Sequence, residues 1–261
     1  MSDSFQNARR KMPICKGARL KIKRANKHIA DIETSIGVLE KGLVVTIGVE
    51  PNTGCEFIKC DFAEIDHRET FDDLPTGIGD AIHNLKCALD HVWVETLTRI
   101  IPSEDWSASK FPVFPTRDEV ERALSNPKKN ISTLAPELFR FVLNEIQPYS
   151  SGNFAIRTVH ELDIEDKHRL LIPIGHYFSI GGIRVESKGE IWPGGTLRTD
   201  IPFPHFLEFE QGIHIKNPGR PTFAVMIQYG DLGEEVRVVD TLKIFSRLIA
   251  AVVERFERFS L

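Results

Sequence analysis

The sequence predicts an α+β fold: a four-helix bundle core with a β-hairpin and a small antiparallel sheet inserted before the C-terminal helix. Several segments space apolar residues three and four apart, which is the pattern of amphipathic helices. Other segments hold short runs of β-branched and aromatic residues between Gly and Pro, which favours strands. With 261 residues the chain can bury a sizeable core, so we expect a single α+β domain over residues 1–261.

Helices are expected at about residues 17–42, 77–100, 116–146 and 238–259. The first has an apolar seam that includes Ile22, Ile29, Ile36 and Leu43. The last helix has a strong apolar stripe, which must be buried, so we expect it to pack on the N-terminal helices. The third range comprises a short helix at 116–124 and another at about 136–146.

Strands are expected in two ranges, about 44–62 and 170–229. The first contains Pro51-Asn52-Thr53-Gly54 between two β-rich runs, which predicts a hairpin. In the second, apolar runs alternate with Gly and Pro, which indicates a small antiparallel sheet. Residues 101–115 are too rich in proline for regular structure, and we expect them to form an ordered strap across the bundle.

Composition excludes some functions. The net charge of −4 argues against holding nucleic acid by global charge. The chain contains no apolar run long enough to span a membrane, and its four cysteines form no CxxC pair, so we expect a reduced, cytoplasmic protein. The sequence has no GxSxG elbow, GxxxxGK[ST] loop or GxGxxG fingerprint, and so offers no support for a serine hydrolase or for ATP or NAD chemistry.

The 77–100 helix concentrates polar side chains of catalytic type on one arc. Its other arc is apolar and includes Ile78, Ile82, Leu85 and Leu89. An ordinary solvated face would be mostly Lys, Glu and Gln, whereas this arc is short-chained and rich in His and Asp, so we expect it to face something specific. Its members are Asp80, His83, Asn84, Cys87, Asp90, His91 and Glu95.

A second polar cluster occupies residues 160–169, where we expect a helix end or a turn. It contains His160 and Asp163, followed by the run Asp166-Lys167-His168-Arg169. A carboxylate such as Asp166 could pair with Arg169 or orient a histidine of the first cluster, as general bases are commonly oriented. Whether the two clusters meet is left open by the sequence.

The pairing of Gly79-Asp80-Ala81-Ile82-His83-Asn84-Leu85-Lys86-Cys87-Ala88-Leu89-Asp90-His91 with the downstream Asp-Lys-His-Arg resembles a family of uncharacterised bacterial proteins with GDxxHNL[RK]xALDH and DKHR motifs. The resemblance covers most of the chain. It carries no established activity.

A looser resemblance is to the HEPN superfamily, four-helix proteins that often carry an Arg followed four to six residues later by a His. Members with that motif include metal-independent ribonucleases of toxin and antiphage systems, which act as dimers. The corresponding residues here are Lys86 and His91, although Lys lacks the planar bidentate grip of Arg on phosphate.

This resemblance implies a metal-independent endoribonuclease that works as a homodimer without a cofactor. His91 would be the general acid or base and Lys86 would offset phosphate charge, while Asn84 and Asp90 would orient the histidine or the phosphate. RNA would be the partner, held by a basic N-terminal strip from Arg9 to Lys27, unless that strip is an ordinary solvated face. Supporting or substrate-binding residues would be His83, Cys87, Glu95, Asp166, Lys167, His168 and Arg169.

Two other functions remain open. Asp80-x-x-His83 and Glu165-x-x-His168 each place a carboxylate three residues before a histidine, a spacing used for di-metal centres in helical bundles, so a hydrolase or oxygenase with a divalent transition metal is one alternative. The other is a non-catalytic binding or interaction protein, in which the polar arc forms a buried hydrogen-bond network that fixes helix register.

Overall fold

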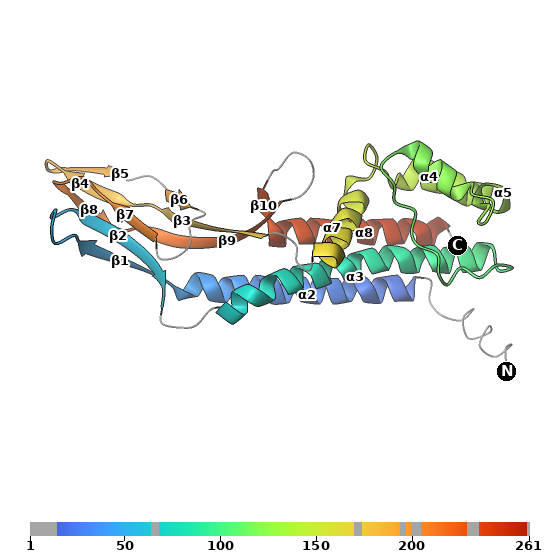
Figure 1. Ribbon diagram of the computed structural model, residues 1–261, viewed down its shortest axis with the longest axis horizontal. Coiled ribbons are helices and arrows are strands. Elements are labelled where there is room, and N and C mark those ends of the chain that lie inside the picture. Colours follow the sequence, from blue (N-terminus) through green and yellow to red (C-terminus); the bar gives the residue numbers. More distant parts are fainter. Residues whose placement is uncertain are drawn as a thin grey trace. The chain divides into compact units, whose positions relative to one another are not determined.

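The computed structural model describes residues 15–63, 68–169, 174–193, 197–199, 205–228 and 235–259, and within these it has the predicted α+β class (Figure 1). The chain divides into two compact units. We call the first, formed by Met1–Ile29, Gly77–Ile172 and Asp240–Leu261, the helical unit. The second, formed by Ala30–Thr76 and Pro173–Val239, is the sheet unit.

Four long helices contribute to the helical unit: α2 (Lys16–Gly42), α3 (Arg68–Ile100), α7 (Phe154–Arg169) and α8 (Val238–Phe259). The last packs against the first, as predicted, and the side chains of Arg19 and Glu257 form an ion pair between them. The Ser246 hydroxyl, 2.6 Å from the amide oxygen of Asn26, donates a second hydrogen bond from α8 to α2. On α7, the ring of Phe154 contacts a ring of α8.

Aromatic rings fill the core of the helical unit. Phe256 of α8 is fully buried, and its ring makes edge contacts with Trp93 of α3 and with Phe111 and Phe141 at centroid separations of 5.1 to 6.4 Å. Edge-to-face geometry is favoured because it places the positive ring edge on the negative ring face. Phe259 lies at the border of this core and stacks on Phe141.

The proline-rich segment is an ordered strap, as predicted. It has no regular structure between the end of α3 and residue 116, yet Trp106, Phe111 and Val113 are buried. The Trp93 indole N–H donates to the Ser109 hydroxyl at 3.2 Å, which ties the strap to α3. The strap therefore belongs to the core.

Short helices follow the strap where the sequence predicts them. Thr116 caps α4 (Arg117–Leu124) with a complete capping box that includes Glu119. The remaining elements are α5 (Ile131–Leu134), α6 (Pro136–Phe141) and a single π-helical segment, η1 (Val142–Ile146).

Two helical features differ from the prediction. Helix α3 starts at Arg68 and runs through Pro75, whereas the sequence places its start at Gly77. A proline inside a helix removes one hydrogen bond but need not end it. Helix α7 is not among the predicted helices, because polar residues interrupt the apolar pattern of this segment after Leu162.

The sheet unit contains three antiparallel sheets of strand order β1-β2-β7, β10-β9-β3-β6 and β5-β4-β8. The predicted hairpin is present: β1 and β2 pair from Leu43↔Phe62 to Val49↔Glu56, with Gly54 in the left-handed region at φ +72°. The strands are β1 (Leu43–Val49), β2 (Glu56–Phe62), β3 (Ile174–Gly181), β4 (Arg184–Ser187), β5 (Glu190–Pro193), β6 (Leu197–Thr199), β7 (His205–Glu208), β8 (Ile213–Asn217), β9 (Arg220–Gln228) and β10 (Glu235–Arg237).

Buried apolar pairs and one carboxylate hold the sheet unit together. Phe178 of β3 lies opposite Phe223 of β9, and both are buried. The Glu56 carboxylate of β2 accepts the Ile215 backbone N–H of β8 at 2.6 Å and lies 2.8 Å from the His214 ring. These bonds lower the pKa of Glu56. Among the described residues, no helix combines the length and apolarity that a membrane span requires.

We expect Phe256→Ala to destabilise the helical unit by about 3–5 kcal/mol, because it opens a cavity between three other rings. Phe259→Ala is the matched control, since its half-buried ring contacts mainly Phe141 and should cost less than half as much. Urea unfolding followed by tryptophan fluorescence measures both. Equal losses for the two variants would contradict a core centred on Phe256.

Candidate active site

A histidine of α3 and a buried aspartate of α7 join the two polar clusters. The Nδ1 atom of His83 lies 2.8 Å from Oδ1 of Asp163, whose side chain is 4% exposed. The other oxygen of that carboxylate is 2.5 Å from Nζ of Lys167. An ionised carboxylate can only accept hydrogen bonds, so this contact places a ring hydrogen on Nδ1, and in the neutral form of an imidazole the lone pair is then on Nε2.

The thiol of Cys87 lies next to the Nε2 atom of His83. Its Sγ is 3.4 Å from Nε2 of His83, one helical turn earlier on α3. The His83 side chain is 43% exposed, so a substrate can reach the pair. A thiol, an imidazole and a carboxylate thus follow one another in hydrogen-bonding order, which is the order that a nucleophile, its base and an orienting group require. We call Cys87, His83 and Asp163 the triad.

A glycine lets α3 and α7 approach at this point. A Cβ at Gly79 would overlap the Asp166 carboxylate, lying 2.8 Å from its Cγ. Burial raises the pKa of Asp166, and the charges of Asp163 and Asp80 raise it further. Asp166 is thus beside the triad, whereas the carboxylate that holds the histidine is Asp163.

Lys86 and Asp90 form a separate ion pair inside the helical unit. Nζ of Lys86 is 2.6 Å from Oδ1 of Asp90, and the Lys86 side chain is 6% exposed. The same oxygen accepts the Phe111 backbone N–H of the strap at 2.8 Å, and Lys110 lies 3.7 Å from the other oxygen. This pair therefore anchors the strap to α3.

His160 is half-buried near these charges. Among the described residues, its Nδ1 has no hydrogen-bond partner. Burial lowers the pKa of His160 to about 4, and the nearby cations Lys86 and Arg157 act in the same direction. The imidazole is therefore neutral at pH 7.

The other half of the predicted polar arc faces α2. The Asn84 amide donates to the backbone carbonyl of Asp80 at 2.8 Å, and its oxygen accepts from Lys21 of α2 at 3.4 Å. His91 is exposed and packs beside Gly17, where a Cβ would lie 3.0 Å from Nδ1. The arc therefore divides between two partners, and His83 and His91 do not share a site.

Glu95 is at the end of this second face. It accepts the backbone N–H of Cys15 at 2.8 Å, just before α2 begins. All four cysteines are free, and burial, followed by the charge of Glu95, raises the pKa of Cys15 to about 12. Cys15 is thus a neutral structural thiol.

The predicted metal set is only partly described. Within the described part of the chain, no three His, Cys, Asp or Glu side chains lie close enough together to bind a metal. Asp80 and His83 belong to α3 and Glu165 to α7, while the side chains of His168 and Arg169 lie outside the described residues, as do Arg9, Arg10 and Lys11 of the basic strip.

His160 and Asp163 belong to the second polar cluster and Gly79 begins the α3 motif, but the sequence indicated no site role for any of the three. A signal for Asp163 is its spacing: it lies seven residues after Ile156 and four after Val159, both buried, which places a carboxylate on an apolar stripe. A charge at such a position needs a partner. Gly79 and His160 carry no comparable signal, because their roles depend on how closely α7 approaches.

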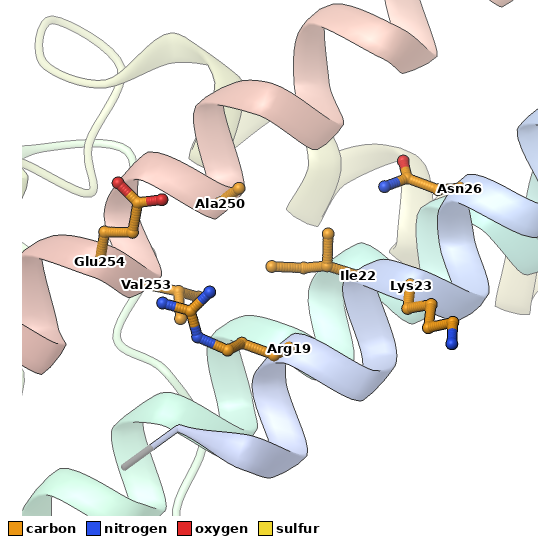
Figure 2. A pocket seen from close by; sticks show the side chains of 7 residues that line it. All are labelled: Arg19, Ile22, Lys23, Asn26, Ala250, Val253 and Glu254. Atoms are coloured by element: carbon orange, nitrogen blue, oxygen red, sulfur yellow. The ribbon is translucent and has the colours of Figure 1, made fainter. Parts of the chain in front are cut away.

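Two grooves in the helical unit are lined by residues other than the triad. One of about 230 Å³ lies between α2 and α8, with Ile22, Ala250 and Val253 as its floor and Arg19, Lys23, Asn26 and Glu254 around it (Figure 2). Another is lined by Phe141, Glu145, Arg255, Arg258 and Phe259.

The chain matches no protein-family model, and neither a curated protein nor a solved structure is significantly similar to it.

We expect His160 to make stability fall as the pH drops from about 6.5 to about 4. Over this range the unfolded chain binds a proton on His160 and the folded chain does not. The contribution is on the order of 2–3 kcal/mol. Urea unfolding at several pH values should show a shallower acid dependence for His160→Gln than for the wild type, and equal slopes would contradict this role of His160.

We expect Gly79→Ala to destabilise the protein by about 1–2 kcal/mol, since overlap with Asp166 outweighs the gain in helix propensity. Gly37→Ala in α2 is the control: a Cβ there meets nothing within 4 Å, so it should stabilise by about 0.5–1 kcal/mol. Thermal unfolding distinguishes them. A stabilising Gly79→Ala would show that α3 and α7 are not in close contact.

Proposed function

We propose that the protein is a metal-independent thiol hydrolase that acts on acyl compounds such as esters, thioesters or amides. The observation that carries this proposal is the chain of contacts from Cys87 Sγ to His83 Nε2 at 3.4 Å and from His83 Nδ1 to Asp163 Oδ1 at 2.8 Å. Each group has the partner that its role requires, and the orienting carboxylate is buried.

The chemistry follows from these positions. Cys87 Sγ attacks the carbonyl carbon of the substrate, and its proton passes to Nε2 of His83. The Asp163 carboxylate accepts a hydrogen bond from Nδ1–H and stabilises the imidazolium. When the tetrahedral intermediate collapses, the leaving group takes the proton from Nε2 and an acyl-thioester remains on Cys87. Water then attacks the thioester with His83 as base, which releases the acid and restores the thiol.

The charges around the triad favour neutral or cationic substrates. Asp80 and Asp166 lie near His83, and Lys167 is already paired with Asp163. Negative potential repels phosphate groups. Acyl substrates therefore suit this site better than phosphodiesters.

The test is the rate at which iodoacetamide alkylates Cys87, followed by peptide mass spectrometry. Cys55 is an internal control, because it is also half-buried but has no histidine partner among the described residues. We expect Cys87 to react faster than Cys55 at neutral pH, and at least tenfold more slowly in His83→Gln, since removing a general base costs about 10²–10⁴ in rate. Asp163→Asn should give an intermediate rate.

Hydrolysis of p-nitrophenyl acetate supplies the second measurement. Wild-type protein should release p-nitrophenol in a burst that is absent in Cys87→Ser and Cys87→Ala. Equal alkylation of Cys87 and Cys55, with no response to His83→Gln, would refute the proposal.

A metal-independent endoribonuclease of HEPN type is the second candidate. It is favoured by the face of α3 that carries Asn84 and the exposed His91, beside Lys21 of the basic helix α2. His91 would be the acid or base. Lys21 would offset phosphate charge, because Lys86 is already buried against Asp90.

Cleavage of labelled RNA in EDTA separates the candidates, because their histidines contact different helices: His83 contacts α7, and His91 packs beside α2. Ribonuclease activity lost in His91→Gln and kept in His83→Gln would favour the second candidate. The reverse dependence for ester hydrolysis favours the first.

A further inference from the structure

Strand β1 forms the outer edge of its sheet and pairs with β2 alone among the described strands (Figure 1). Its register is unbroken from Leu43↔Phe62 to Val49↔Glu56. At either end, the Glu50 N–H donates to Cys55 and the Ala63 N–H donates to Gly42, each at 2.8 Å. Antiparallel hydrogen bonds alternate, so residues 44, 46 and 48 bond β2. The N–H and C=O groups of residues 43, 45, 47 and 49 therefore point to the free edge.

This edge lacks the features by which edge strands normally avoid pairing. The strand reads Leu-Val-Val-Thr-Ile-Gly-Val, without a charge, a proline or a bulge. Its last residues also leave apolar surface uncovered. Ile47 and Val49 share a face with the buried Ile58, yet they are 45% and 58% exposed. The apolar face of the sheet therefore continues to the edge at Ile47 and Val49, where these side chains remain exposed, whereas Leu43 at the other end of β1 is buried.

We propose that β1 is a dimerisation edge, on which β1 of a second copy pairs antiparallel about a two-fold axis. The strand is self-complementary. Every second residue offers an N–H and a C=O, and two uncharged strands bring no like charges together. Pairing would place the apolar faces side by side, so Ile47 and Val49 of each copy would cover those of the other. A two-fold axis closes the assembly at two chains.

The position of Val45 provides a sharp variant. Its N–H points away from β2, so Val45→Pro removes a hydrogen bond from the free edge and none from the β1–β2 ladder. Ile47→Lys is an independent variant that places a charge on the apolar face at the same edge. Ile191→Lys on β5 is the matched control, because Ile191 is 64% exposed on another sheet.

Sedimentation velocity of the full chain over about a hundredfold range of concentration measures the effect. Wild type and Ile191→Lys should sediment as dimers. Val45→Pro and Ile47→Lys should raise the dimer dissociation constant at least tenfold while their circular dichroism and melting remain those of a folded protein.

Four outcomes would overturn the proposal. A monomeric wild type would show that β1 does not pair with a second copy, and an extended segment of another protein would then be the occupant of this edge. Species larger than a dimer would indicate open, head-to-tail pairing. A dimer that persists in both folded β1 variants would place the interface elsewhere. A dimer that Ile191→Lys also weakens tenfold would place part of it on β5. If Val45→Pro does not fold, the dimer dissociation constant of Ile47→Lys alone tests whether β1 forms the dimer interface.

Discussion

Two carboxylates, the buried Asp163 of α7 and the half-buried Asp90 of α3, constrain how the helical unit packs. Asp163 is 4% exposed and depends on His83 and Lys167, while Asp90 depends on Lys86 and the strap N–H of Phe111. An unpaired buried charge costs several kcal/mol, so α7 and the strap must lie where these partners reach them. Asp163 thereby determines which face of α7 packs against α3, and Asp90 determines the path of the strap.

Packing makes this arrangement possible. Gly79 leaves room for the Asp166 carboxylate of α7 against α3, and the rings around Phe256 fill the space between α3, α8 and the strap. The polar contacts supply direction, which apolar packing alone does not. His83 is consequently held at a defined orientation with its free nitrogen toward Cys87. A surface histidine without these supports would sample several rotamers.

The amphipathic elements were the predictable part of this protein. Apolar spacing located α2, the main part of α3 and α8, while turn residues located the β1–β2 hairpin. These patterns are local, because the apolar spacing of a helix and the turn residues of a hairpin are read from neighbouring positions in the sequence. The start of α3 and the whole of α7 were not predicted, since Pro75 is normally a boundary and the polar residues of α7 hide its period.

By itself, the sequence determined that α3 carries two histidines, a cysteine and carboxylates on an arc that does not face solvent alone, since residue spacing fixes a helix face. The tertiary structure decided how that arc divides. Asp163 approaches His83 from α7, whereas α2 brings Gly17 and Lys21 to His91 and Asn84. Those partners lie about sixty to eighty residues away along the chain, and only the packing of separate helices brings such residues within hydrogen-bonding distance.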